Sequence, residues 1–367
     1  MAKLVFNTNE LKQGLAIVSK AAAQRSTLDI LSSVLIEAKD GVVVLTCSDQ
    51  EKEISTTISE TSKEGVAIAI PVKELMTIVS KLPGEETSLE LKENQIVIRS
   101  GKSRFTLASK DDAMKFPKMS KANGTTFNLN GLEFADKLKR TLYAVGAGDG
   151  PNQIMGTIHF VINKGKATMT CLDGHRIAIN NFVADGVDNV DIMIPATVGK
   201  IILPLLKEES LVVTVESNNI NFKINKTSVS TRLVSGSYFK IDSMIANTNA
   251  NVTVKVNTQD LLDTISRAKV VVDMASERKP VVLTLTDKGE MNVSTKTSIS
   301  SMEETVDAEI VKGDWEKIGF NPKFLEELLL QLPETETVTM EFSNPKAPMI
   351  VRGESFLHLV LPVNIQA

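Results

Sequence analysis

Apolar residues recur along this chain with two different spacings, which predict two kinds of element. Leu11, Leu15 and Val18 are four and three positions apart, as on the buried face of an amphipathic helix. Val66, Ile68 and Ile70 alternate with small residues, as in a strand. In the first third, these spacings predict strands near 3–7, 53–59, 66–70, 88–91, 95–99 and 104–108, helices over 9–20 and 72–82, and a hairpin across Asp40-Gly41.

The same order of elements recurs twice more. Glycines 124 residues apart occupy hairpin-like turns, at Gly41, Gly165 and Gly289, the last of them in Asp287-Lys288-Gly289. Prolines at a similar interval open apolar helical runs, at Pro71, Pro195 and Pro322. Further helices are expected over 130–145, 196–207, 258–269 and 322–332.

A period of this size is the length of a whole domain rather than of a solenoid repeat. We therefore predict an α+β protein with three tandem copies of one domain. Each copy consists of two half-units, and each half-unit is a strand, a helix and three strands. The domains are expected at 1–123, 124–249 and 250–367, with polar links at 119–124 and 246–251.

Composition narrows the class of protein. Aromatic residues make up only 4% of the chain, so the three cores must consist mostly of Val, Ile and Leu. The sequence has neither a signal peptide at its N-terminus nor an apolar run long enough to span a membrane. We expect a soluble, cytoplasmic protein with no membrane partner.

The two cysteines invite a disulfide or metal role, but a simpler interpretation is available. Cys47 and Cys171 lie one period apart in matching strand contexts, Thr-Cys-Ser-Asp and Thr-Cys-Leu-Asp. The favoured interpretation is a small buried residue used twice at one strand position. No CxxC pair or His-carboxylate cluster has metal-ligand spacing, so no metal site or cofactor is expected.

Charge is distributed unevenly although the net charge is −4. The six predicted helical segments together carry +4, which leaves −8 for the rest of the chain. If the six helices shared one face, that face would be basic and would attract phosphate groups without reading sequence. The alternative is that these lysines and arginines are ordinary solvated residues of helix surfaces.

Signs of catalysis are scarce. The chain lacks a phosphate-binding loop, a nucleophile elbow and the HExxH metal motif. Asp173-Gly174-His175-Arg176 places a carboxylate near a possible base, but Asp-Gly between two predicted strands is typical of a turn. Asp49, Glu51 and Glu53 are interpreted as the solvated face of a strand. An enzyme with a site near His175 and a structural array of repeated domains remain as alternatives.

Four segments, spread over all three thirds, are distinctive enough to compare with a known family. They are Arg25-Ser26-Thr27-Leu28, residues 98–107 followed by Lys115-Phe116-Pro117, Asp173-Gly174-His175-Arg176, and residues 359–363. Together they resemble the corresponding segments of the bacterial sliding clamps, the beta subunits of DNA polymerase III. The resemblance covers the whole chain.

That resemblance implies a fold and a set of partners. Three similar domains would form each subunit, and two subunits would close head to tail into a homodimeric ring with helices lining the hole and sheets forming the outer wall. The ring would encircle double-stranded DNA and bind the replicative DNA polymerase, the clamp loader and other proteins with a clamp-binding motif. It would have no catalytic residues of its own.

The resemblance also implies site residues. Arg25 matches an arginine that touches DNA, and the helical charge suggests further cations on or near the hole. The expected DNA-facing set is Lys12, Lys20, Arg25, Lys73, Lys81, Lys137, Lys139, Arg140, Lys200 and Arg267. A pocket for partner peptides, between the second and third domains, is expected to comprise Ile154, Leu172, Gly174, His175, Arg176, Ile177, Met244, Pro348, Val360, Leu361, Pro362 and Val363.

The sequence departs from the family in places. Asn152-Gln153 replaces an aromatic pair that contacts DNA. A Pro-Asp-Tyr-Arg segment of the pocket is replaced by residues 239–242, Phe-Lys-Ile-Asp, so Tyr238, Phe239 and Met244 are expected to take over its role. Asn364 stands where an arginine is often found.

Overall fold

The computed structural model describes most of the chain, and everything below concerns those residues. They are 3–59, 65–92, 95–108, 113–120, 122–148, 150–245, 250–275, 278–286, 288–315, 317–332 and 336–365. Asp287 of the third predicted turn and most of the predicted link at 246–251 lie outside them.

All six predicted half-units are present in the expected order. The first third comprises β1 (Lys3–Asn7), α1 (Thr8–Val18), β2 (Ser33–Lys39), β3 (Val42–Ser48), β4 (Lys52–Ser59), β5 (Val66–Pro71), α2 (Val72–Val79), β6 (Glu86–Lys92), β7 (Gln95–Ser100) and β8 (Ser103–Ala108). The second comprises β9 (Thr125–Asn130), α3 (Gly131–Leu142), β10 (Thr157–Asn163), β11 (Lys166–Leu172), β12 (Arg176–Val183), β13 (Val190–Pro195), α4 (Ala196–Ile202), β14 (Ser210–Val215), β15 (Asn219–Ile224) and β16 (Thr227–Arg232).

The last third repeats the order with two differences from the prediction. It comprises β17 (Val252–Asn257), α6 (Thr258–Ala275), β18 (Val281–Thr286), β19 (Glu290–Lys296), β20 (Ser301–Lys312), β21 (Ile318–Phe320), α7 (Pro322–Leu329), β22 (Thr337–Phe342), β23 (Met349–Arg352) and β24 (Phe356–Val360). Helix α6 extends six residues beyond the predicted end at 269. A short helix that the sequence did not predict, α5 (Ile241–Ile245), precedes this third.

Helix starts follow from asparagine caps. The side chain of Asn7 accepts hydrogen bonds from the backbone N–H groups of Asn9 and Glu10, so Asn7 and not Asn9 begins the first helix. Asn257 caps α6 in the same way. Asn321 caps α7, whose first residue is proline, a residue that has no N–H to leave unpaired there.

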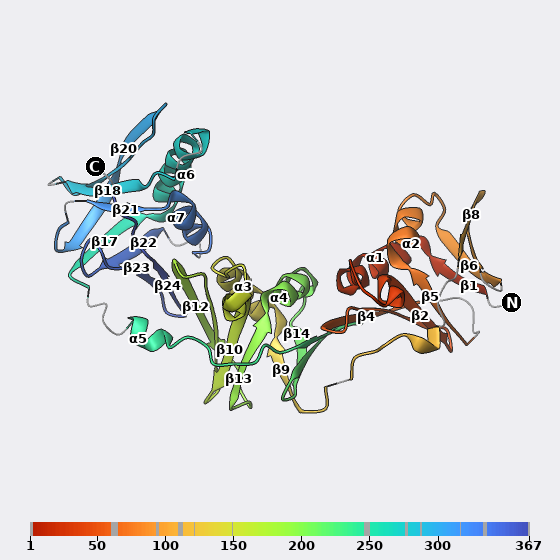
Figure 1. Ribbon diagram of the computed structural model, residues 1–367. Helices are drawn as coiled ribbons and strands as arrows, with labels where there is room; N and C mark the ends of the chain where they lie inside the picture. Colours follow the sequence, from red (N-terminus) through yellow and green to blue (C-terminus); the bar gives the residue numbers. More distant parts are fainter. Residues whose placement is uncertain are drawn as a thin grey trace. The chain divides into compact units, whose positions relative to one another are not determined.

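Contacts between residues group the chain into two compact units. The first contains 1–132 and 204–233, and the second contains 133–203 and 234–367. In the first unit, α1 and α2 pack against each other beside an eight-stranded sheet, β5-β2-β3-β4-β16-β15-β14-β9 (Figure 1). A separate four-stranded sheet, β1-β6-β7-β8, completes that unit.

The second unit is built on a twelve-stranded sheet of order β13-β10-β11-β12-β24-β23-β22-β17-β20-β19-β18-β21. Helices α6 and α7 pack together, and α6 covers β19 and β20 (Figure 1). The core beneath them is mostly aliphatic, with Trp315, Phe320 and Phe342 as its aromatic members.

Both cysteines are buried and unpaired, as the simpler interpretation predicted. Cys47 lies on β3 and Cys171 on β11, each fully buried. Burial raises the pKa of both thiols, which keeps them protonated and unreactive. The equivalent position in the third copy, Thr295, is buried too.

One structural interpretation of acidic residues was wrong. Asp49 and Glu51 do not lie on a strand, because the Asp49 side chain accepts hydrogen bonds from the N–H groups of Glu51 and Lys52 and closes a turn before β4. Asp173 forms the same turn before β12, with the N–H groups of His175 and Arg176. This turn therefore repeats with the domains.

Candidate functional site

Two sequence segments expected to form one site lie on neighbouring strands. Strand β12 begins directly after the Asp173 turn, and the C-terminal motif, residues 359–363, begins at the end of β24. The strands pair antiparallel with Arg176 opposite Val360 and Ile177 opposite Leu359. Beyond the ladder, the N–H of Leu361 donates to the carbonyl of His175 at 2.8 Å. This pairing joins the second and third copies of the domain into one sheet.

A small apolar cluster lies on this pairing. Its buried members are Leu172, Ile177, Ile350 and Leu359. Residues packed against it while staying partly exposed are Met155, Ile179, Tyr238, Phe239, Ile241 and Leu357. We call this set the junction cluster. Leu172 and Ile177 were predicted for the pocket, and Tyr238 and Phe239 were predicted to replace the missing family segment.

Strand alternation places one predicted residue elsewhere. Val360 is fully buried and belongs to the core of the C-terminal third, whereas its neighbour Leu359 belongs to the junction cluster. Successive side chains of a strand point to opposite faces, so both cannot line one surface. The predicted wall residue Val360 therefore faces away, and Leu359 takes its place. The alternation in β24 is the signal that could have identified Leu359.

The other predicted pocket residues differ in accessibility. Met244 on α5 and Leu361 after β24 are exposed, at 47% and 37%. Ile154, Pro348 and Pro362 are half-buried, and Gly174 and His175 are exposed in the turn. Val363 pairs instead with Gly319 of β21, through its N–H at 2.8 Å from the Gly319 carbonyl. The Val363 side chain is nevertheless 38% exposed, so the exposed apolar side chains among these predicted residues are Met244, Leu361 and Val363.

Arg176 holds the second and third copies together. Its guanidinium forms ion pairs with Asp173 at 2.9 Å and with Glu327 on α7. It also lies over the rings of Phe324, at 4.6 Å, and Tyr143, at 5.1 Å. Because Arg176 is only 6% exposed, its charge is committed within the protein and is not free to anchor a peptide.

This arrangement does not supply the acid–base pair that an enzyme at His175 would need. One carboxylate oxygen of Asp173 accepts the backbone N–H groups of His175 and Arg176, and the other accepts the Arg176 side chain. The His175 ring stacks on Phe324 with centroids 5.6 Å apart. Both oxygens of the neighbouring carboxylate are therefore occupied by structural hydrogen bonds.

A buried polar group supports the same joint. The hydroxyl of Tyr143 lies 3.1 Å from Nδ1 of His358, and the Asn180 amide donates to the Thr141 hydroxyl at 3.0 Å. Burial, with a smaller contribution from the Arg140 charge, lowers the pKa of His358 to about 3. His358 is therefore neutral in the folded protein at any physiological pH.

Stability is expected to depend on His358 below neutrality. The unfolded chain takes up a proton near pH 6.5 and the folded one only near pH 3, so stability falls as the pH is lowered between these values. Lowering the pH from 7 to 5 should cost about 2 kcal/mol from this residue alone. Urea unfolding at both pH values would measure it. His358→Gln should show a smaller loss, and an equal loss in both proteins would contradict the assignment.

The joint between the first and second copies is polar at the position that corresponds to the junction cluster. There β4 pairs with β16, and the pair equivalent to Ile177 and Leu359 is Glu53 opposite Ser230. The Glu53 carboxylate accepts the N–H of Met119 at 2.7 Å. An acid and a hydroxyl thus stand in the first joint where two buried apolar residues stand in the second.

Nine of the ten predicted DNA-facing cations lie on helices or within two residues of a helix end, and Arg25 lies in the loop between two short 3-10 helices, 19–21 and 29–32. Several of the ten are engaged within the protein. Arg140 pairs with Asp136 at 2.7 Å and donates to the Gln331 carbonyl. Lys137 lies 3.5 Å from the same carboxylate and is mostly buried. Arg267 pairs with Glu304 on β20. Lys12 reaches the carbonyl of Leu82 at 3.5 Å. Lys81, Lys139 and Lys200 belong to α2, α3 and α4 or their ends.

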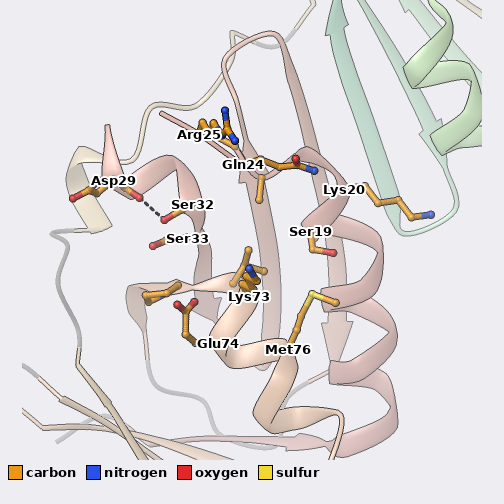
Figure 2. Close-up of a pocket in the computed structure, with 14 residues that line it drawn as sticks. Ser19, Lys20, Gln24, Arg25, Asp29, Ser32, Ser33, Lys73, Glu74 and Met76 are labelled. Carbon is orange, nitrogen blue, oxygen red and sulfur yellow. Dashed lines mark hydrogen bonds between the residues drawn. The ribbon is translucent and has the colours of Figure 1, made fainter. Parts of the chain in front are cut away.

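The remaining cations of the first third surround a cavity of about 840 Å³. Lys20, Arg25 and Lys73 line it, and none of them forms an ion pair with another residue that the structure describes. Figure 2 shows Arg25 and Gln24 on one side, with Lys73 and Glu74 at the start of α2 on the other. Asp29, whose carbonyl accepts the Ser32 hydroxyl at 2.7 Å, closes a third side. The three cations are therefore available to an external anion.

Membrane-spanning helices and metal-binding clusters are both absent from the described ranges. No helix in them is both long and apolar enough to cross a membrane. Nor do His, Cys, Asp or Glu side chains gather in those ranges in any group of three that could hold a metal ion.

Family models match nearly the whole chain. The model described as the N-terminal domain of the DNA polymerase III beta subunit matches residues 2–120. Those described as its central and C-terminal domains match 128–240 and 243–363. The matches follow the three predicted thirds in order. The boundaries at 123 and 249 themselves stay predictions.

Individual relatives agree with these matches. The beta sliding clamp of Staphylococcus aureus is 28% identical over 364 residues, which cover 94% of each chain. The DNA polymerase sliding clamp of Bacillus subtilis superposes with a TM-score of 0.92 at 22% identity, covering 99% of both chains. The DNA polymerase III beta chain of Streptococcus pneumoniae gives 0.91 at 24% identity, covering 99% of this chain and 100% of its own.

Proposed function

The chain belongs to the family of DNA polymerase III beta subunits, the sliding clamps, and from this premise we propose that two copies close into a ring around duplex DNA. The ring has no catalytic step. It tethers the replicative polymerase and other proteins through the junction cluster, and a clamp loader places it on DNA. One observation carries the ring: two joints of the same design exist within the chain, and each of the two strands for a third has an edge that pairs with no described strand.

The two internal joints share one rule. The fourth strand of one domain pairs with the last strand of the next, as β4 does with β16 and β12 with β24. The third domain's fourth strand is β20, and its residues 301–307 pair with β19 on one side alone among the described strands. The first domain's last strand is β8, an edge strand paired with β7. By the same rule, β20 of one subunit pairs with β8 of the next.

The repeat also sets the register of this third joint. Lys52 faces Thr231 and Arg176 faces Val360 in the internal joints. The register of the β19–β20 hairpin makes Ser300 equivalent to Lys52 and Arg176. The register of the β7–β8 hairpin makes Leu107 equivalent to Thr231 and Val360. The resulting antiparallel ladder places Met302 opposite Phe105 of the partner subunit and Glu303 opposite Arg104 of the partner subunit. The register thus gives one apolar pair and one pair of opposite charges, and both kinds of cross-strand pair stabilise a sheet.

Side-chain exposure supports the same joint. Phe105 on β8 is 39% exposed, and Ile299, in the turn before β20, is 65% exposed. Val270 and Met274, on α6, are exposed as well. Thr297 and Ser300 form the turn that Asp173 and Arg176 form in the second copy. Each subunit would contribute one such edge to each of two identical joints, so the ring closes.

Crosslinking tests this register directly. At the end of each internal joint, one carbonyl accepts an N–H from the neighbouring domain: Glu51 from Arg232, and His175 from Leu361. The equivalent residues of the third joint are Ile299 and Ala108 of the partner subunit, so these two should lie opposite each other. A protein with cysteine at both positions should form a closed covalent dimer with a short bis-maleimide. Cysteines at Ala108 and Val183 are the control. If the control crosslinks equally well, the proposed joint is wrong.

The DNA face needs only weak contacts. A closed ring cannot leave DNA sideways, so mobile contacts with phosphates allow sliding without release. The unpaired Lys20, Arg25 and Lys73 around the first-domain cavity suit this role better than Lys137, Arg140 and Arg267, which are bound to the protein's own carboxylates. Tethering raises the polymerase's effective concentration at the primer end.

Neutralising the three cavity cations should weaken DNA binding without changing sequence preference. Replacing Lys20, Arg25 and Lys73 with glutamine leaves up to three phosphates without a cation, which should flatten the salt dependence of log K by roughly 0.9 for each such phosphate. Fluorescence anisotropy over a salt series would measure this. Glutamine at Lys166, Lys223 and Lys288, on strands or turns, is the matched control. Equal effects of the two triple variants would show that only net charge matters.

A further inference from the structure

A histidine lies beside the junction cluster in a position that the proposed function has not yet used. His159 is on β10, and its Nε2 lies 2.8 Å from the Asp191 carboxylate on β13, the next strand of the sheet. The His159 ring stacks on Tyr238, with centroids 4.2 Å apart and planes 21° apart. The imidazole is therefore fixed on one side by a carboxylate and covers an aromatic ring on the other.

Tyr238 belongs to a segment outside the sheets and helices. Residues 233–240 form neither helix nor strand between β16 and α5. Backbone N–H groups anchor only its start: that of Leu233 donates to the Asn218 carbonyl at 2.8 Å and that of Val234 to the Met193 carbonyl at 2.9 Å. Further along, the Tyr238 hydroxyl donates to the Thr170 carbonyl at 3.3 Å. Because so few backbone bonds hold this segment, side-chain contacts must set the position of Tyr238.

Tyr238 in turn positions the residues that cover the junction cluster. Phe239 meets the Tyr238 ring edge to face, with centroids 5.5 Å apart. Tyr238, Phe239 and Ile241 all pack against the buried members of the cluster, and Met244 follows on α5. A displacement of Tyr238 would therefore move Phe239 and alter the surface offered to a peptide.

We propose that His159 is a positioning residue for the peptide pocket: its ring, oriented by Asp191, holds Tyr238 and through it sets the place of Phe239. The proposal rests on the proposed function, since it assigns a role within the pocket. The stacking of the His159 ring on Tyr238 is what holds Tyr238 in place. Asp191 is 76% exposed, and a polar contact to so exposed a carboxylate contributes little by itself.

The position of Tyr238 can be measured without any peptide. The chain contains only two tyrosines, so 3-fluorotyrosine labelling gives two fluorine NMR signals, assigned with Tyr238→Phe. His159→Ala should shift and broaden the Tyr238 signal, because the stacked ring is gone, and leave that of Tyr143 unchanged. An unchanged Tyr238 signal would overturn the proposal.

Peptide affinity provides the second readout, with the C-terminal tail of the replicative polymerase as the probe. His159→Ala should weaken binding about 3- to 10-fold, as expected when one aromatic pair is removed. His159→Phe keeps the ring and should restore affinity to within about twofold of the wild-type protein, whereas His159→Gln should behave like alanine. In a Tyr238→Ala background, His159→Ala should have no further effect.

The outcomes separate the two claims. If wild-type protein binds the tail and His159→Ala binds it equally well, the positioning role is refuted and the pocket stands. If wild-type protein does not bind the tail but the Tyr238 signal shifts as expected, positioning of Tyr238 by His159 is supported and the proposed pocket is wrong. Equal losses for His159→Phe and His159→Ala would refute the role of the ring.

Discussion

Phe105→Asp is expected to convert the dimeric protein into monomers at micromolar concentration. In the inferred joint, Phe105 of β8 faces Met302 of the partner subunit, so the substitution replaces an apolar pair with a carboxylate that has no partner there. Burying an unpaired charge costs far more than one cross-strand pair contributes. Because Phe105 is 39% exposed in the single chain, the monomer should fold normally. Sedimentation equilibrium over a range of concentrations would measure the mass.

Two variants make this result specific. Val183→Asp places the same charge on β12 at a residue that is 63% exposed and outside the inferred joint, so its mass should stay dimeric. Arg104→Glu should weaken the dimer, and adding Glu303→Arg should restore part of the loss, because the register places these two residues opposite each other. A Phe105→Asp protein that remains dimeric would refute the pairing of β8 with β20.

Met244→Asp, and independently Leu361→Asp, should reduce binding of the polymerase tail at least 10-fold. Both side chains are exposed, and they follow the junction-cluster residues Ile241 and Leu359 closely in the chain. Each substitution should therefore introduce a charge where a peptide would bury apolar groups, without disturbing the core. Isothermal titration calorimetry would measure the affinity. Leu132→Asp, at 48% exposure on α3, is the control. If both variants bind the tail as wild-type protein does, the peptide site lies elsewhere.

These substitutions are preferable to removing the C-terminal residues. The N–H of Val363 bonds to the carbonyl of Gly319, and Ile365 lies against the same glycine. Truncation from residue 362 would therefore expose β21 and affect stability as well as binding. Dimer mass and melting temperature should be unchanged in Met244→Asp and Leu361→Asp, which separates a binding defect from a folding defect.

The fold was largely accessible from the sequence because its signals are local and repeated. Alternating residues such as those of β5 and turn glycines such as Gly165 predicted strands and hairpins, and the 124-residue period multiplied that evidence. The unpredicted helix α5 has only five residues, too few to show a helical period. The added length of α6 lies in a run of valines, whose low helix propensity hid it.

The site was less accessible because it depends on tertiary contacts. Motif similarity brought β12 and β24 together, but it did not distinguish Leu359 from Val360, whose opposite directions follow from strand parity. Nor did it show that Arg176 is enclosed by Asp173 and Glu327. Such partners lie up to 151 residues away in the sequence, where composition and spacing carry no information.

Retention on closed compared with linear DNA tests the central claim, that the protein holds DNA by encircling it, most directly. After loading by the clamp loader, wild-type protein should stay on a nicked circular duplex through gel filtration in high salt, and cutting the circle once should release it. The three-cation variant should still be retained once loaded, whereas Phe105→Asp should not be retained. Equal retention on circular and linear DNA would show that contacts rather than topology hold the protein, and would contradict the account.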